Sequence, residues 1–422
     1  MSSFGKFFGK FRSSPKQPTQ DSLTEQIELQ KNLTMLQKDL STLQEKLGVS
    51  EKKIFVMNMS VLQNYTMPLY NINVFMTANT GDNLLVMALQ KSIRQMVGPV
   101  DLINYYINHR VTGSDLQLFN NSKGIIIGGG GLFSPSDQAS ISGWRLRMSS
   151  KEINNIHVPI FLLANGYNRF IGQPDFNSFF RENFNILIKK CAFAGFRNHG
   201  SINALRNYLD DDALKNKLMF HPCPTTILSK LYDIPKVKVQ EPFVVLNCAF
   251  DKPQYRFQKR QDEILESTAR VMAELAKDYK IKYYAHTSSD IRMLPYLEKA
   301  KVTYDLVKLY EPENITRDFL ELYAAPSLVI AMRGHAQMIP FGCGTPILSL
   351  VSHNKLAWFL DDIGHPEWSV NIQDRAYEEK VLSTAKSILS NQEKVREEIA
   401  QEKEKLFAVT KKNLEHIRDL LQ

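Results

Sequence analysis

The residues best suited to chemistry lie between positions 332 and 346. The segment 332–336 reads MRGHA and follows an apolar run at 328–331, and the segment 342–346 reads GCGTP. In an extended chain Arg333 and His335 would point to the same side, because they are two residues apart. A cation beside a titratable imidazole suits anion binding coupled to proton transfer. We interpret His335 as functional, against the alternative of a structural hydrogen-bonding histidine.

A run of four glycines at 128–131 follows the apolar residues 125–127. Glycines directly after a strand let backbone N–H groups approach an anion closely, and a helix start after them adds a favourable dipole. The spacing matches neither GxGxxG nor a P-loop, so it does not predict a standard dinucleotide or ATP site. We favour ligand approach over a tight structural turn, with Gly129, Gly130 and Gly131 as the binding residues.

Two further positions follow predicted strands. Gly81 and Asp82 lie between a predicted strand at 71–78 and a predicted helix at 84–96, where Asp82 could cap the helix or hold a sugar hydroxyl or a water. Arg197 follows a predicted strand at 192–196, where a guanidinium can bind a carboxylate or phosphate bidentately. Taken alone, Asp82 reads as a cap and Arg197 as a surface ion pair.

These candidates need elements that bring them together, and the apolar pattern supplies alternating strands and helices from about residue 50. A proline- and lysine-containing break at 232–242 separates two such series, and from 376 onward the chain is helical and heavily charged. The pattern predicts an α/β fold with two Rossmann-like domains, whose strand ends face a shared cleft. We place the domains at 51–236 and 237–375, followed by a C-terminal helical segment at 376–422.

Composition limits the class of protein. The 422 residues are 43% hydrophobic, so each half can bury its own core. No apolar run is long enough to cross a membrane and no apolar signal region begins the chain, which predicts a cytoplasmic protein. The four cysteines are far apart, so neither disulfides nor a zinc site is expected. The net charge of +8 favours an anionic partner, but the aromatic residues do not interleave with a basic stripe as in nucleic-acid binders.

The first fifty residues differ from the rest. Residues 1–20 form a basic aromatic tail with Phe4, Phe7, Phe8 and Phe11 at helical spacing. This pattern fits either a helix that lies on a membrane surface or a disordered tail, and both remain open. Residues 21–50 predict a coiled-coil helix, since leucines recur at heptad spacing from 29 to 47. We favour homo-oligomerisation through 29–47 over a single helix packed on its own domain.

Together these motifs resemble those of the polysaccharide pyruvyl transferases, from about residue 70 to 370. The resemblance rests on Gly81-Asp82, the glycines at 128–131, Arg197, the RGHA and GTP segments at 333–336 and 344–346, and Lys355. Two positions depart from the family pattern. Gly334 stands where the family often has leucine, and no arginine follows the predicted strand at 243–247, where Lys252 or Arg256 could substitute.

The resemblance implies a fold like that of GT-B glycosyltransferases, with phosphoenolpyruvate as the donor. His335 would then be the general acid that protonates the donor's methylene carbon. Arg197 and Lys355 would hold its carboxylate and phosphate, and Arg333 would either contact an anion or orient the loop. No metal or cofactor would be needed.

The acceptor implied is a lipid-linked or nucleotide-linked sugar at the cytoplasmic face of the membrane. Two hydroxyls of this sugar would attack C2 in turn, so that phosphate leaves and a pyruvate ketal forms. Two other functions stay open at this point. One is a nucleotide-sugar-dependent GT-B glycosyltransferase, and the other is a non-catalytic binding protein oligomerised through its leucine seam.

Overall fold

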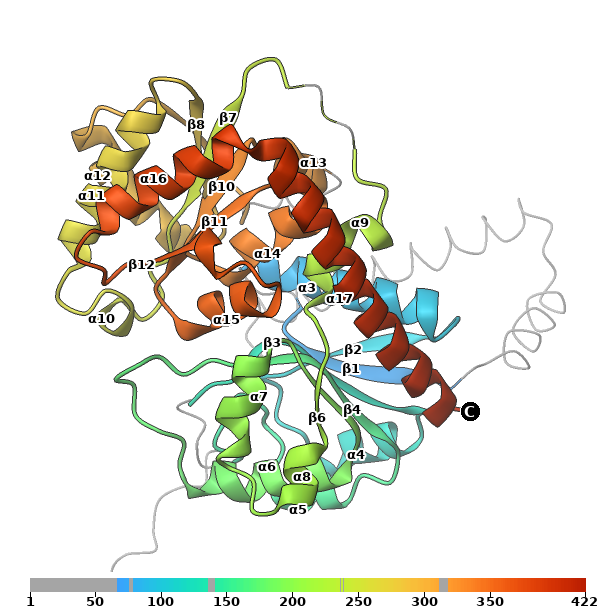
Figure 1. Ribbon diagram of the computed structural model, residues 1–422. Coiled ribbons are helices and arrows are strands. Elements are labelled where there is room, and N and C mark those ends of the chain that lie inside the picture. The colour runs from blue at the N-terminus through green and yellow to red at the C-terminus, as the bar shows by residue number, and fades with distance from the viewer. Residues whose placement is uncertain (1–66, 76–78, 136–140, 236, 238, 311–317) are drawn as a thin grey trace, which may run out of the picture. The chain divides into compact units, whose positions relative to one another are not determined.

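The computed structural model describes residues 67–75, 79–135, 141–235, 237, 239–310 and 318–422. These residues form two six-stranded parallel sheets with helices packed against them (Figure 1). The α/β prediction with two Rossmann-like parts is therefore confirmed. The predicted basic tail and the predicted coiled-coil segment lie outside the described residues.

The first sheet contains the strands between residues 69 and 220. Its order is β2(Leu102–Tyr106), β1(Leu69–Asn73), β3(Gly124–Phe133), β4(Ile160–Tyr167), β5(Cys191–Phe196), β6(Leu218–Phe220). The strand order reverses between β1 and β3, which are hydrogen-bonded in parallel. At such a reversal, the loops that follow the two neighbouring strands turn to opposite faces of the sheet. A crevice then forms between them at the strands' carboxyl ends.

The second sheet contains the strands between residues 243 and 371. Its order is β12(Ser369–Asn371), β11(Ile347–Val351), β10(Leu328–Ala331), β7(Phe243–Asn247), β8(Lys280–Ala285), β9(Tyr304–Lys308). Read in chain order from β7, this is the 3-2-1-4-5-6 order of dinucleotide-binding sheets. Its reversal lies between β7 and β10, whose carboxyl ends carry residues 248–251 and Arg333.

The side chains of each strand alternate between the two faces of the first sheet, which explains why both faces are covered. Tyr70 and Ile72 of β1 pack into one apolar cluster, whereas Leu69 packs into another on the opposite face. Strand β3 divides in the same way, with Ile125 and Ile127 on one side and Ile126 on the other. Successive side chains of a strand point to opposite faces, so an uninterrupted apolar strand must be buried on both.

Two pairs of helices join the parts of the chain that carry the two sheets. Helix α3(Thr80–Met96) contacts α14(Gly334–Cys343), and Thr80 Oγ1 donates a 2.6 Å hydrogen bond to the carbonyl of Leu309 (Figure 1). Helix α7(His199–Arg206) contacts α15(Asn354–Asp362), where His199 Nδ1 lies 2.9 Å from Asp362 Oδ1. Both pairs place the first turn of one helix close to a strand end of the other sheet.

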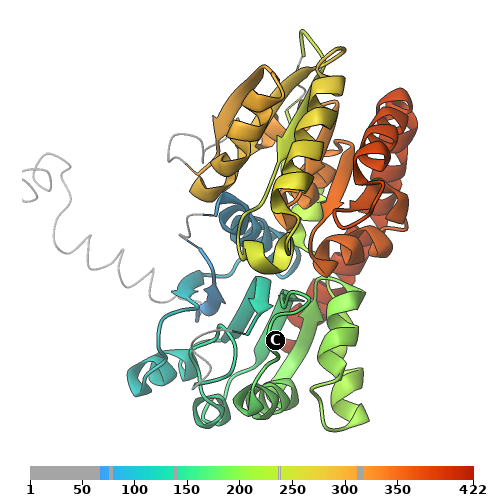
Figure 2. The same cartoon turned by 90° about the vertical axis from the view of Figure 1, so that its left-hand side faces the viewer.

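The last helix, α17(Gln392–Leu420), returns to the first sheet. Its Leu414 and Ile417 are buried in the same cluster as Leu89 and Ile93 of α3. The C-terminus accordingly lies beside the first sheet in both views (Figures 1 and 2). The heavily charged pattern of this segment therefore describes only the outer side of α17.

Further helices and turns complete the described part of the chain. They are α4(Gly113–Asn120), α5(Ser150–Asn154), α6(Ser178–Lys190), α8(Asp212–Asn216), α9(Leu228–Leu231), α10(Pro253–Arg256), α11(Gln261–Leu275), α12(Leu294–Lys299), α13(Asp318–Ala324) and α16(Tyr377–Ser390), with 3-10 turns η1(Pro224–Ile227), η2(Ser288–Met293) and η4(Pro366–Trp368). Among the helices in the described ranges, none is long and apolar enough to cross a membrane.

Three local predictions were wrong. Strand β3 does not end before the glycines but runs through them to Phe133. The sequence also predicts a strand at 158–164 that stops at Asn165-Gly166, whereas β4 continues through these residues to Tyr167. Helix α3 begins at Thr80, with Asn79 as its N-cap, so that Gly81 and Asp82 lie in its first turn rather than in a loop. In each case pairing or packing with a distant segment decides the conformation of small or polar residues.

Candidate functional site

A cavity of about 410 Å³ lies where the carboxyl ends of the central strands of both sheets meet. The first sheet and its loops contribute Asn79, Asp82, Gly131, Arg145, Asn168 and Arg197 to its lining. The second contributes Asp251, Arg256, His286, Thr287, Ser289, Met332, Arg333, Gly334, His335 and Lys355. The sequence candidates His335, Arg197, Lys355, Arg333 and Asp82 are thus brought together in one cavity.

His335 lies in the first turn of α14 and is held between two side chains. Its Nδ1 is 3.3 Å from Oδ1 of Asp82, and its Nε2 is 4.0 Å from Sγ of Cys223. Gly81 makes this approach possible, because a Cβ at that position would lie 2.5 Å from the Cβ of His335. Asp82 therefore positions the imidazole, a role that goes beyond the capping expected from its place in the sequence.

The charges of this pair depend on each other. Burial alone would lower the pKa of His335, but the hydrogen bonds to Asp82 and Cys223 outweigh it and raise the pKa to about 9. Burial would raise the pKa of Asp82, and the hydrogen bond and charge of His335 hold it below the ordinary value instead. At neutral pH His335 is consequently an imidazolium beside a carboxylate, which is the state of a general acid.

Arg197 follows β5 and is almost fully buried, with 6% of the residue exposed. Its Nε and Nη2 have no hydrogen-bond partner among the described residues. The guanidinium lies against Gly166, where a Cβ would come within 2.2 Å of Nε. Buried guanidinium groups are normally paired, so these donors mark a place for an anion. Arg197 is not the surface ion pair that its sequence context alone would suggest.

Lys355 lies in the first turn of α15 and faces Arg197. Its Nζ donates a 2.7 Å hydrogen bond to Oδ1 of Asn168. Burial, followed by repulsion from Arg197 and Arg256, lowers the pKa of Lys355 to about 7, although Asp251 and Asp82 oppose the shift. A bound anion would relieve this repulsion, and the two cations together suit a ligand with more than one negative group.

Arg333 lines the cavity but is already paired. Its Nε donates to Oδ2 of Asp290 at 2.8 Å, and its Nη1 lies 3.2 Å from Oδ1 of Asp251. Arg256 is also buried and donates to Asp251 at 2.7 Å. Of the two roles expected for Arg333, these contacts favour orientation of the loop before α14. The extended geometry expected for 333–335 is wrong, because Gly334 begins the helix.

The glycine run has a different role from the expected anion loop. Gly131 lines the cavity, and a Cβ there would lie 2.9 Å from the side chain of Asn168. At Gly129 a Cβ would lie 3.1 Å from the carbonyl oxygen of Ala164 in β4, and at Gly130 3.4 Å from Leu85. No helix start follows the run directly, because β3 continues to Phe133. The glycines allow close packing of protein segments, and only Gly131 borders the cavity.

Sequence reasoning missed Arg145 and Asn168. Arg145 follows Trp144, whose buried ring stacks on Phe133 at 4.3 Å and whose Nε1 donates to Asn183. Asn168 follows β4 directly, a position at a strand's carboxyl end that could have marked it as a candidate. No comparable signal marks Arg145. Within the described ranges, no group of three or more His, Cys, Asp and Glu residues is placed to hold a metal ion.

Comparison with known proteins agrees with the resemblance seen in the sequence. The family model for polysaccharide pyruvyl transferase matches residues 79–354, which is well over half of the chain. No curated protein has a sequence that matches the chain at a significant level. The matched range contains the residues of the candidate site named above except Lys355, which lies one position beyond its end.

Several solved structures are similar to the chain over most of its length. The S. aureus MnaA–UDP co-structure is 12% identical with a TM-score of 0.50, over 79% of this chain and 91% of that one. Anabaena HepE in complex with UDP and glucose is 9% identical with a TM-score of 0.49, over 82% and 98%. UDP-GlcNAc 2-epimerase from Neisseria meningitidis bound to UDP-GlcNAc is 11% identical with a TM-score of 0.45, over 79% and 94%. At 12% identity the likeness to the MnaA structure concerns the fold alone, which is GT-B-like as expected.

Proposed function

The chain belongs to the polysaccharide pyruvyl transferase family, and we propose that it transfers a pyruvyl group from phosphoenolpyruvate to a sugar, forming a ketal and releasing phosphate. The observation that carries the donor assignment is the buried guanidinium of Arg197, whose Nε and Nη2 lack partners among the described residues. It lines the same cavity as the electrostatically destabilised Lys355 and a protonated His335. Two cations and one acid suit a small anion that must be protonated.

In the proposed reaction His335 gives its proton to the methylene carbon of phosphoenolpyruvate, which becomes a methyl group. The positive charge that develops at C2 is stabilised by the phosphate oxygen. A sugar hydroxyl attacks C2 and forms a C–O bond, and its proton restores the imidazolium. Phosphate then leaves with the electrons of its bond to C2 and takes the proton of the second hydroxyl, which attacks C2 and closes the ketal.

Arg197 and Lys355 hold the carboxylate and phosphate of the donor in this proposal. Their hydrogen bonds strengthen as charge gathers on the leaving phosphate, so they lower the barrier as well as bind the substrate. Gly81 and Asp82 keep the imidazolium in place. Arg333 acts through its pairs with Asp290 and Asp251 by fixing the loop that precedes His335.

The test is release of phosphate from phosphoenolpyruvate by the purified protein, supplied with a mixed panel of glycans and of lipid-linked and nucleotide-linked sugars. We expect acceptor-dependent release that falls by 100-fold or more in His335→Ala, in line with the typical contribution of a general acid. Arg197→Ala should lose donor binding measured by calorimetry. His157→Ala and Arg181→Ala, which alter exposed side chains outside the cavity, serve as matched controls.

Absence of any phosphoenolpyruvate binding would contradict the proposal. Turnover of a nucleotide sugar without phosphoenolpyruvate would instead support the glycosyltransferase alternative.

A further inference from the structure

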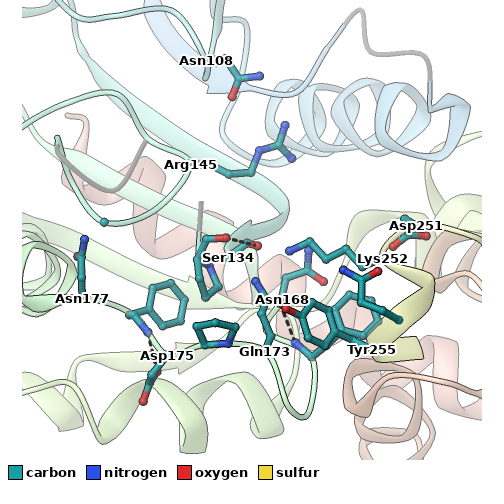
Figure 3. A pocket seen from close by; sticks show the side chains of 16 residues that line it. Asn108, Ser134, Arg145, Asn168, Gln173, Asp175, Asn177, Asp251, Lys252 and Tyr255 are labelled. Atoms are coloured by element: carbon teal, nitrogen blue, oxygen red, sulfur yellow. Dashed lines mark hydrogen bonds between the residues drawn. The ribbon is translucent and has the colours of Figure 1, made fainter. Parts of the chain in front are cut away.

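A second cavity of about 710 Å³ adjoins the first and shares three of its lining residues, Arg145, Asn168 and Asp251 (Figure 3). The reaction proposed above needs two substrates that meet at one carbon atom. The smaller cavity holds the unpaired guanidinium of Arg197, Lys355 and His335, so it provides for the donor. The shared residues are then the place where a second substrate reaches the donor.

The walls of the second cavity differ in character from those of the first. They combine the rings of Phe170, Phe176 and Tyr255 with amide side chains. Phe170 is buried and Phe176 stacks on Phe180 at 3.9 Å, whereas Tyr255 is half-buried and its ring is 6.4 Å from that of Phe170. Phe176 is half-buried as well, but Phe180 stacks on its ring, whereas no ring stacks on Tyr255 among the described residues. An aromatic ring among amide groups suits a pyranose, which has an apolar C–H face and hydroxyls at its rim.

The charges of this lining balance. Among the described residues of the lining, the ionisable side chains apart from Tyr255 are two cations, Arg145 and Lys252, and two carboxylates, Asp175 and Asp251. A site for a nucleoside diphosphate or a lipid pyrophosphate would need a surplus of cations. The balance favours an uncharged ligand. The volume lies within the range of about 300–1,000 Å³ for sites that enclose drug-sized ligands, which leaves room for more than one sugar ring.

Arg145 connects the two cavities. The buried neighbours Trp144 and Leu146 fix its backbone, and among the described residues its guanidinium has neither an ion pair nor a hydrogen-bond partner. In Figure 3 it lies across the opening from Asn168 and Tyr255. A guanidinium can donate to two neighbouring hydroxyl oxygens at once. Arg145 is thus placed to hold a diol next to the donor.

We propose that this second cavity is the acceptor subsite and binds an uncharged oligosaccharide, whose terminal ring lies at Arg145 and whose next ring stacks on Tyr255. The inference rests on the proposed function. It assigns recognition to the glycan itself rather than to a nucleotide or lipid carrier. Tyr255 and Gln254 of α10 determine specificity, and they lie outside the lining of the donor cavity.

The experiment measures two binding reactions separately. Binding to an array of neutral hexose and N-acetylhexosamine oligosaccharides reports on the acceptor subsite, and calorimetry with phosphoenolpyruvate reports on the donor cavity. We expect the wild type to bind a subset of the oligosaccharides, with about tenfold weaker binding in Tyr255→Ala and retained binding in Tyr255→Phe. Donor affinity should change less than twofold in both. Phe179→Ala, an exposed ring outside both cavities, is the control.

Three results would overturn the inference. One is that the wild type binds no oligosaccharide at millimolar concentration, and another is that Phe179→Ala weakens binding as much as Tyr255→Ala. The third is that UDP or a nucleotide sugar binds in a Tyr255-dependent manner while the oligosaccharides do not. In each case intact binding of phosphoenolpyruvate would leave the proposed function standing, whereas loss of donor binding alone would contradict that function and not the glycan subsite.

Discussion

At the scale of single residues, the site contains two titratable groups whose pKa values are moved in opposite directions. Contacts with Asp82 and Cys223 raise the pKa of His335 to about 9, and burial near Arg197 lowers the pKa of Lys355 to about 7. Environments that separate two groups in this way commonly assign different catalytic roles to them. Here the histidine is the better-protonated acid, and the lysine is a cation that becomes fully charged only when an anion arrives.

The role of Asp82 can be tested through pH dependence. In the proposed reaction His335 acts in its protonated form, so turnover should be insensitive to this group below its pKa and should fall as pH rises through about 9. Asp82→Asn removes the carboxylate that raises this pKa, so the alkaline limb of kcat should move to lower pH by about one unit or more. Asp210→Asn, at an exposed carboxylate, is the control. An unchanged limb in Asp82→Asn would contradict the pairing.

The lowered pKa of Lys355 predicts that the protein takes up a proton when the donor binds. At pH 8 a lysine with a pKa of about 7 is mostly neutral, and a bound dianion raises that pKa. Binding of phosphoenolpyruvate at pH 8 should therefore take up about one proton, measured from calorimetric enthalpies in buffers of different ionisation enthalpy. In Lys355→Arg the side chain is charged throughout, so the uptake should vanish while some affinity remains. Equal uptake in both proteins would exclude Lys355 as its source.

At the scale of elements, the site depends on how closely the first turns of α3 and α14 approach. Gly81 of α3 touches His335 of α14, and Thr80 is tied to the carbonyl of Leu309. The two helices therefore bring together a carboxylate and an imidazole that are more than 250 residues apart in the chain. The approach is possible only with a residue that lacks Cβ at position 81.

Gly81→Ala tests this contact. Alanine favours a helix over glycine, so local stability should not fall on that account. The added methyl group would displace the ring of His335, and we expect kcat/KM to drop by about 100-fold with the thermal unfolding midpoint changed by only a few degrees. Gly113→Ala is the matched control, because the start of α4 has open space around that position. A similar loss of activity in both variants would point to a non-specific effect.

At the scale of the whole molecule, α17 links the end of the chain to the first sheet. Lys403 Nζ is 3.0 Å from Ser229 Oγ, Asn413 donates to the carbonyl of Phe220, and Leu414 is fully buried beside α3. A chain whose last helix packs on its first sheet should unfold cooperatively, because loss of the helix exposes the face of the first sheet that α3 also covers.

Leu414→Asp places an unpaired carboxylate in that cluster. We expect a loss of about 3 kcal/mol or more in the free energy of unfolding, since burial of an unpaired charge is among the largest single-residue costs. Lys412→Asp introduces the same residue on the exposed side of the same helix and should change stability by less than about 1 kcal/mol. The measurement is chemical denaturation followed by circular dichroism. Equal stability of the two variants would show that α17 contributes little.

Oligomerisation through 29–47 stays a prediction, which mass measurement of Leu36→Glu in solution would test.

The sequence by itself determined the fold class and the main candidates. Apolar strands at 243–247 and 328–331 were predicted with their observed bounds, because a strand buried on both faces needs an uninterrupted apolar run. His335, Arg197, Lys355 and Asp82 could be selected because chemistry needs ionisable groups at strand ends or helix starts, and such positions are readable from local pattern.

Only the tertiary structure decided which charged side chains are paired within the protein and which can bind a ligand. Arg333 and Arg197 look alike in sequence. Asp290 and Asp251 neutralise Arg333, whereas Nε and Nη2 of Arg197 have no partner in the described part of the chain. Arg145 and the glycan-sized cavity carried no local signal. Pairing, burial and cavity shape depend on residues far apart in the chain, so the same local pattern can end as a structural ion pair or as a binding site.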